Sequence, residues 1–283
     1  MCLDTASFYT LFNSPYTPHR EGHAVDIYFP DSEALLPLEE ARVMEIKKIE
    51  VPMYRSDAEN HDYLLILKLD SMHVAKILHV EPRVRVHEKL VYGDPIGRII
   101  ISGYFYIWSE PHMHLEIRYI HDRYRARGGL KLAISRHRAV PAQSITAIRG
   151  VVTKVCNYYI LLKPYGASLE GPTPIAVDTE GAVAYFEGGY PHYGYAVILT
   201  TRSTRGRPLG MYSVYIVESC DPVGSILRVK RLGFEGIATY IGREEMKLVF
   251  RDRARVSGVK EGDVLEIEDL SSSISLGTDS SDG

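Results

Sequence analysis

Histidine and carboxylate side chains occur at three places in the first half of the chain, at spacings that suit a metal ion or acid–base chemistry. His19 is followed along the chain by Asp26, with a glycine between them. His79 stands alone at the end of an apolar stretch, whereas His112 and His114 form a His-x-His pair. Because side chains alternate between the two faces of a strand, both imidazoles of that pair would lie on one face.

A set of histidines with one carboxylate matches the ligands of a catalytic zinc ion. Such an ion takes three protein ligands from His, Asp or Glu and keeps a fourth position for water, whose pKa it lowers to about 7. A further imidazole beside it can act as general base or stabilise an oxyanion, and proton transfer of this kind contributes roughly 10²–10⁴-fold in rate. The sequence therefore predicts a zinc-dependent hydrolytic site in its first half.

The later motifs resemble the closing part of the lysostaphin-type zinc peptidases. In that family a Gly-Asp-x-Val/Ile turn leads through a glycine-rich hairpin to a His-x-His strand. This chain has Gly93-Asp-Pro-Ile-Gly97, then Gly103, then the stretch Pro-His112-Met-His114-Leu-Glu-Ile. His79 matches the separate strand histidine that precedes the turn in the family.

The first motif is similar to a related family instead. Lysostaphin-type enzymes usually carry His-x-x-x-Asp, but the residue four positions before Asp26 is Gly22. The stretch His19-x-x-Gly22-x-Ala24-x-Asp26 is similar to the His-x-x-Gly-x-Ala-x-Asp motif of the D-Ala-D-Ala carboxypeptidases, which have a related zinc fold with the same ligand set. The combined resemblance covers roughly residues 17–118.

The resemblance implies a role for each of these residues. Three of them would bind Zn²⁺, namely His19, Asp26 and His114. His112 and His79 would be the catalytic groups around the water and the scissile carbonyl. His23 lies three residues before Asp26 and is an alternative first ligand; His19 is favoured because it keeps the whole motif in register.

Short segments of alternating or β-branched apolar residues must position these groups, and helical periodicity is scarce. The pattern predicts strands in the first half over Ala24–Phe29, Arg42–Ile49, Tyr63–Leu69, Val74–His79, Arg98–Tyr106 and His112–Tyr119. In the second half it predicts strands over Ala147–Cys156, Tyr158–Leu162, Ala182–Phe186, Tyr195–Thr200, Tyr212–Val217, Ile226–Lys230, Ile237–Ile241, Met246–Phe250 and Val264–Ile267. We expect a mainly β protein: an antiparallel-sheet, zinc-peptidase-like domain followed by a second β-rich, barrel-like domain.

The best domain boundary lies in the basic, glycine-containing stretch Arg123–Lys131, with the division near Gly128. The first domain would span residues 1–128 and the accessory domain residues 129–270. Residues 271–283 are rich in Ser, Gly and Asp. They hold too little apolar surface to offset the entropy of ordering, so we expect a disordered tail.

Charge and composition exclude several classes of partner. With 33 basic and 36 acidic residues the net charge is −3, which favours neither nucleic acid nor an anionic membrane. Three scattered cysteines form no Cys-x-x-Cys pair, so a disulfide scaffold is not expected. No stretch approaches the ~18 apolar residues of a membrane span, and the start has no leader-like pattern. We expect a soluble, cytoplasmic protein.

The sequence predicts hydrolysis of peptide or amide bonds by water activated on a metal, with a peptide or amide as partner. The alternative is a non-catalytic binding or scaffold protein that uses the same β fold, with or without zinc. The two interpretations differ in whether His19, Asp26 and His114 converge and whether substrate can reach them. Neither the substrate nor the oligomeric state is indicated by the residues.

Overall fold

The chain folds into two compact units in the computed structural model. The first comprises Met1–Ala133 together with Tyr240–Arg243, and the second comprises Ile134–Thr239 and Glu244–Gly283. The division after Ala133 falls a few residues beyond the Gly128 boundary expected from the sequence. The four residues that join the first unit from far along the chain were not predicted.

The structure describes residues 1–144, 147–166, 169–179, 182–190, 192–200, 207–209, 211–218 and 234–268. The predicted strand Ile226–Lys230 and the expected tail at residues 271–283 lie outside the described residues.

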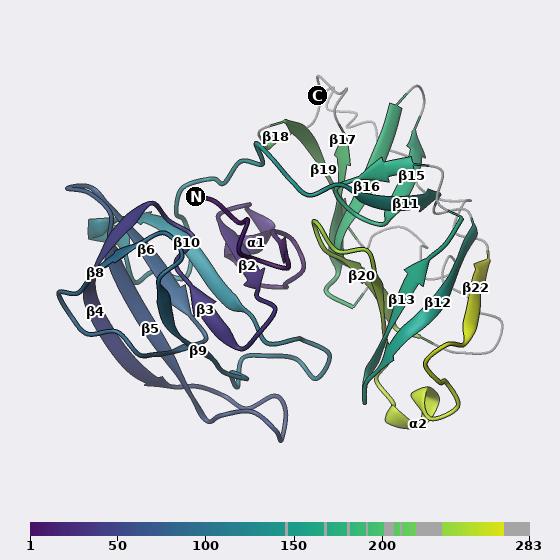
Figure 1. Cartoon of the computed structure of the whole chain (residues 1–283), viewed down its shortest axis with the longest axis horizontal. Coiled ribbons are helices and arrows are strands. Elements are labelled where there is room, and N and C mark those ends of the chain that lie inside the picture. The colour runs from purple at the N-terminus through teal and green to yellow at the C-terminus, as the bar shows by residue number, and fades with distance from the viewer. Residues whose placement is uncertain are drawn as a thin grey trace, which may run out of the picture. The chain divides into compact units, whose positions relative to one another are not determined.

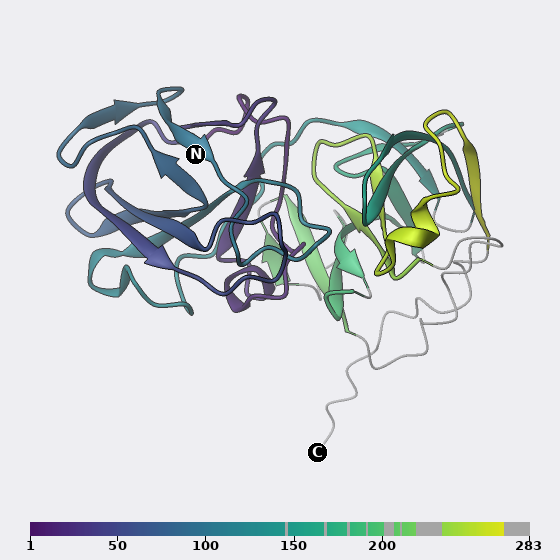
Figure 2. The same cartoon turned by 90° about the horizontal axis from the view of Figure 1, so that it is seen from below.

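A seven-stranded sheet forms the body of the first unit (Figure 1). In spatial order its strands are β1 (Phe8–Thr10), β2 (Ala24–Tyr28), β10 (Met113–Tyr119), β6 (His73–Leu78), β5 (His61–Lys68), β4 (Glu40–Glu50) and β8 (Lys89–Val91). All neighbouring strands pair antiparallel. A three-stranded antiparallel sheet accompanies it, made of β3 (Glu33–Leu35), β9 (Pro95–Ile99) and β7 (Val80–Pro82). The larger sheet is curved rather than flat (Figure 2).

Burial differs between the strands of this sheet. All five residues of β2 are buried, whereas β4 alternates exposed and buried residues at its start and is largely open at its end. In the central strands Leu65, Ile77 and Leu115 are fully buried. Each such side chain contributes roughly 1.5–3 kcal/mol to stability. The predicted apolar runs therefore coincide with buried strands, and the mainly β prediction is confirmed.

The prediction of one strand over Arg98–Tyr106 is wrong. Strand β9 ends at Ile99, and tight turns follow, with the Phe105 amide donating to the Ser102 carbonyl at 2.9 Å. Gly103 lies so close to another segment that a Cβ there would be 2.1 Å from the Pro52 carbonyl oxygen. The apolar residues after Ile99 pack as side chains of a folded loop, so their alternation does not mark a ladder.

Helices are short in the described residues. They are α1 (Thr17–Arg20), the 3₁₀ turn η1 (Ile120–Asp122) and α2 (Arg253–Val256). None of the helices in the described part of the chain has the length and apolar character needed to cross a membrane.

The second unit is also built of strands (Figure 1). Its main order is β14 (Leu169–Gly171), β11 (Val140–Ser144), β15 (Ile175–Thr179), β16 (Ala182–Tyr190), β20 (Gly236–Thr239), β21 (Met246–Val249), β13 (Tyr159–Pro164), β12 (Ala147–Val155) and β22 (Val264–Glu268). A side branch adds β17 (Tyr195–Thr200), β19 (Tyr212–Glu218) and β18 (Arg207–Leu209). Pairing is antiparallel except between β11 and β15. One apolar core, which includes Ile160, Phe186 and Leu248, fills this unit.

Candidate metal centre

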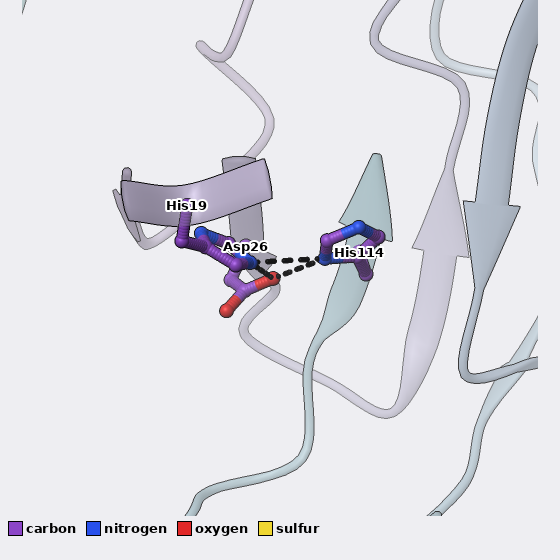
Figure 3. A group of neighbouring side chains, drawn as sticks. All are labelled: His19, Asp26 and His114. Atoms are coloured by element: carbon purple, nitrogen blue, oxygen red, sulfur yellow. Dashed lines mark hydrogen bonds and ion pairs between the residues drawn. The ribbon is translucent and has the colours of Figure 1, made fainter. Parts of the chain in front are cut away.

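His19, Asp26 and His114 meet in the first unit from three different elements (Figure 3). The antiparallel pairing of β10 with β2 places His114 directly opposite Asp26. His19 comes from α1, whose chain reverses at Gly22 with a φ of 72° before β2 begins. A positive φ suits glycine, which has no Cβ to clash. The glycine of the first motif therefore serves the turn that brings helix and strand together.

The three groups present one ligand atom each at close range. His19 Nε2 lies 3.2 Å from Asp26 Oδ1 and 3.1 Å from His114 Nδ1. His114 Nδ1 lies 2.9 Å from Asp26 Oδ1. Atoms bonded to one zinc ion at roughly 2.0–2.1 Å in a tetrahedron are about 3.3 Å apart. The triangle thus needs to expand by only a few tenths of an ångström, and the donor set fits a zinc ion.

Each ligand imidazole is held through its other ring nitrogen. His19 Nδ1 lies 2.7 Å from the Leu11 carbonyl oxygen, which makes it the donor and leaves Nε2 to bind. His114 Nε2 lies 3.2 Å from Glu116 Oε1 and leaves Nδ1 to bind. Hydrogen-bonded partners of this kind fix the tautomer and orientation of metal-binding histidines.

Glu116 is itself anchored in the interior. Lys76 Nζ donates to its Oε1 at 2.8 Å, and the Arg118 guanidinium donates to its Oε2. Burial alone would raise the pKa of Glu116, but His114 and Lys76 outweigh burial and lower it to about 2. The carboxylate therefore stays ionised as the outer partner of His114.

The charges of the cluster compensate one another. Burial opposes ionisation of Asp26, yet the neighbouring charge and hydrogen bonds of His112, His19 and His114 hold its pKa well below the usual range. Burial also disfavours the charged form of His114, but its contacts with Asp26 and Glu116 raise its pKa to about 9. The cluster therefore prefers a positive charge between these two carboxylates, and a divalent cation would also meet this preference.

His112 and His79 lie beside the three ligands. His112 Nδ1 donates to the Glu110 carbonyl oxygen at 2.8 Å, and its Nε2 lies 3.5 Å from Asp26 Oδ2. Burial lowers the pKa of His112 to about 4, with the Asp26 charge opposing that shift. The ring centroid of His79 is 5.3 Å from that of His112 and 6.0 Å from that of His114. All five histidine and aspartate residues of the prediction come together.

Asp62 is a further residue of this site, and sequence reasoning missed it. It is fully buried and accepts from His79 Nδ1 at 2.5 Å, from the His79 amide at 2.9 Å and from Ser102 Oγ at 2.7 Å. These contacts hold His79 at a φ of 68°, which is rare for a residue with a side chain. Burial would raise the pKa of Asp62, but His79 and Ser102 lower it below the ordinary value.

His23, the alternative first ligand, does not join the cluster. Its Nδ1 lies 3.2 Å from Glu21 Oε2. In the described part of the chain, the group formed by His19, Asp26 and His114 is the one arrangement of three such side chains close enough to share an ion.

Comparisons with known proteins give little beyond this geometry. A family model described as "Domain of unknown function (DUF8155) N-terminal domain" matches residues 1–134. No curated protein matches the chain.

Among solved structures, the chain is similar to the catalytic domain of the antimicrobial peptidase lysostaphin from Staphylococcus simulans, with 16% identity and a TM-score of 0.26 over 39% of this chain and 79% of that one. The solution structure of lysostaphin has 14% sequence identity to this chain and a TM-score of 0.25, and the match covers 69% of this chain and 87% of that one. A further structure of lysostaphin from Staphylococcus simulans has 14% sequence identity and a TM-score of 0.28, and the match covers 75% of this chain and 95% of that one. Similarity at this level does not indicate a function.

Proposed function

We propose that the first unit is a zinc-dependent hydrolase of peptide or amide bonds. The observation that carries the proposal is the convergence of His19 Nε2, Asp26 Oδ1 and His114 Nδ1. An outer contact on each of the two imidazoles leaves its converging nitrogen able to bind. The spacing fits one small cation, and the mixed His and Asp set suits zinc better than magnesium or calcium, which prefer oxygen ligands.

When bound, zinc would supply a water of lowered pKa and a Lewis acid for the carbonyl oxygen. The chain itself would supply the proton transfers. His112 donates from Nδ1 to a backbone carbonyl, so Nε2 is its basic atom, and this atom faces Asp26. His79 donates from Nδ1 to Asp62, so its Nε2 is likewise the atom available to accept a proton.

The two imidazoles differ in what supports them. Asp62 is a buried carboxylate that would stabilise His79 when it carries a proton, as in other histidine–aspartate pairs. His112 has a neutral carbonyl as its Nδ1 partner, and burial disfavours its charged form. We therefore assign His112 to taking a proton from the attacking water at Nε2 and passing it on to the leaving amine, and His79 to holding the second proton of that water.

The class of substrate rests on the resemblance of the motifs to the lysostaphin-type and D-Ala-D-Ala carboxypeptidase families. Both imply a peptide or amide carbonyl as the group attacked. The partner that we infer for the site is accordingly a peptide or amide.

The test is cleavage of a peptide mixture by the zinc-loaded full chain, with products identified by mass spectrometry. His112→Ala and His79→Ala should retain zinc and lose roughly 10²-fold or more in rate, because each removes a proton-transfer group. His121→Ala, which changes an exposed histidine of the same unit, is the matched control. Zinc-loaded wild-type protein that cleaves none of the peptides would contradict hydrolysis, and equal rates in wild type and His112→Ala would contradict the role assigned to His112.

A non-catalytic role for the same groups is the second candidate, and burial favours it. His19 and Asp26 are 1% and 2% exposed, and His79, His112 and His114 are each 7% exposed. A cluster so enclosed can brace β2 against β10 without turning over a substrate. Zinc binding without cleavage of any peptide would support this candidate.

A further inference from the structure

The segment Tyr240–Arg243 is part of the first unit, although β20 and β21 of the second unit flank it in the sequence. Tyr240 is 1% exposed and Ile241 is fully buried. Ile241 exchanges two backbone hydrogen bonds with Tyr9, at 2.8 and 3.1 Å. The segment is thus an integral piece of the unit that holds the candidate metal centre.

Arg243 connects this segment to the residue that holds His112. Its guanidinium makes a two-pronged ion pair with Glu110, with nitrogen–oxygen distances of 2.8 and 3.2 Å. The two side chains are only 7% and 13% exposed. The backbone carbonyl of the same Glu110 accepts the hydrogen bond from His112 Nδ1. Paired arginine–carboxylate bonds fix orientation as well as distance, so the ion pair restrains the side chain of the residue whose carbonyl holds His112.

Tyr240 is linked to His112 through a second contact, the ring of Tyr28. Its ring lies edge-on to Tyr28, with centroids 5.3 Å apart. Tyr28 in turn contacts the His112 ring at 5.3 Å. Tyr28 ends β2, the strand that carries Asp26. One side of the imidazole is therefore bounded by an aromatic ring that Tyr240 supports, while its Nδ1 is held by the carbonyl that Arg243 supports.

We propose that Tyr240–Arg243 is the positioning element for His112, and that Arg243 acts through Glu110 to keep this imidazole protonated at Nδ1 with Nε2 directed at Asp26. What His112 does in the reaction rests on the proposed function, but its position and tautomer do not. Arg243 acts on His112 through Glu110, so it is a positioning residue. A corollary is that residues 1–134 alone do not contain all of the site's supports.

The experiment is nitrogen NMR of the histidine rings in the metal-free full chain at neutral pH, because it reports which ring nitrogen carries the proton. In wild-type protein we expect His112 as a single Nδ1–H tautomer. In Arg243→Met we expect this signature to be lost to a mixture of tautomers, while the signals of His19 and His114 stay unchanged. Arg98→Met is the matched control, because it also removes a paired contact to a carboxylate, that of Glu81, from the same unit.

Three results would overturn the proposal: a wild-type His112 protonated at Nε2, an unchanged His112 signal in Arg243→Met, or equal changes in all three histidines. The last would mean that Arg243 braces the fold as a whole. Should Arg243→Met not fold, Glu110→Gln gives the same test, since it keeps the shape of the side chain and removes its charge. Zinc content is measured separately on each protein, so a failure to bind zinc would count against the proposed function alone.

Discussion

At the scale of single residues, each imidazole of the site has one ring nitrogen engaged by a fixed acceptor. Leu11 and Glu110 provide backbone carbonyls to His19 and His112, while Glu116 and Asp62 provide carboxylates to His114 and His79. The other nitrogen of each ring is thereby the one that can bind a metal or accept a proton. The sequence could have indicated Glu116, because it follows His112 and His114 at the same spacing of two along one strand face. It could not indicate Asp62, because this contact depends on how β5 pairs with β6.

Asp62→Asn should destabilise the protein by roughly 1–3 kcal/mol at neutral pH, because the carboxylate is buried and accepts several hydrogen bonds. The folded-state pKa of Asp62 is depressed below 3.8, so its stabilising effect is complete above that pH and is lost as the pH falls further. The gap between wild type and variant in urea unfolding should therefore narrow below pH 3.8.

Asp31 is exposed, so Asp31→Asn is the control substitution and should change the free energy of unfolding little. A gap between wild type and Asp62→Asn that stays constant across the acid range would refute the depressed pKa.

Glu116→Gln should weaken zinc binding by about 10–100-fold, as is usual when the outer partner of a ligand histidine is changed. The glutamine keeps the shape of the side chain but removes the charge that supports His114. Competition with a chelator gives the affinity. Glu81→Gln, at an exposed ion pair with Arg98, should leave affinity unchanged; equal affinity in both variants would show that Glu116 does not tune the site.

At the scale of elements, the antiparallel register of β2 and β10 brings two of the three ligands together, since it sets Asp26 opposite His114. Short runs rich in apolar residues predict both strands closely, because nearly all residues of β2 and β10 are buried. The same reasoning fails after Ile99, where Gly103 packs against the Pro52 carbonyl and the aromatic residues belong to turns. An apolar pattern in the sequence indicates which side chains are buried. It does not distinguish a buried strand from a loop whose side chains are buried.

Gly97→Ala should destabilise the protein by roughly 1–3 kcal/mol, because added atoms must displace their surroundings. A Cβ at this position in β9 would lie 2.1 Å from the carbonyl oxygen of Glu81, which is backbone and cannot swing aside. Thermal unfolding measures the effect. At Gly258 nothing lies within 4 Å of an added Cβ, so Gly258→Ala is the control; equal melting temperatures for the two variants would contradict the close approach of β7 and β9.

At the scale of the whole molecule, the chain is mainly β in both units, as its composition of short apolar runs predicts. The return of Tyr240–Arg243 to the first unit could not be predicted, because Ile237–Ile241 has the pattern of one continuous strand. In the structure β20 ends at Thr239, and Ile241 pairs with Tyr9 instead. Local periodicity does not specify which distant backbone a residue will pair with. The cytoplasmic location remains a prediction.

Ile241→Ala should lower the free energy of unfolding by about 2–5 kcal/mol, because it leaves a cavity at a fully buried position. In hydrogen exchange on the full chain, the Tyr9 amide, which donates to the Ile241 carbonyl, should lose protection. Val183→Ala changes a side chain that is 40% exposed and serves as control. Unchanged protection of Tyr9 in Ile241→Ala would argue against the segment as part of the first unit.

The most direct measurement is elemental analysis of the purified full chain after exposure to zinc and removal of excess metal, alongside His114→Ala and the exposed-site control His121→Ala. We expect about one zinc per chain in wild type and in His121→Ala, and none in His114→Ala, because a site of three protein ligands loses one of them. Wild-type protein without zinc, or His114→Ala with as much zinc as wild type, would contradict this prediction.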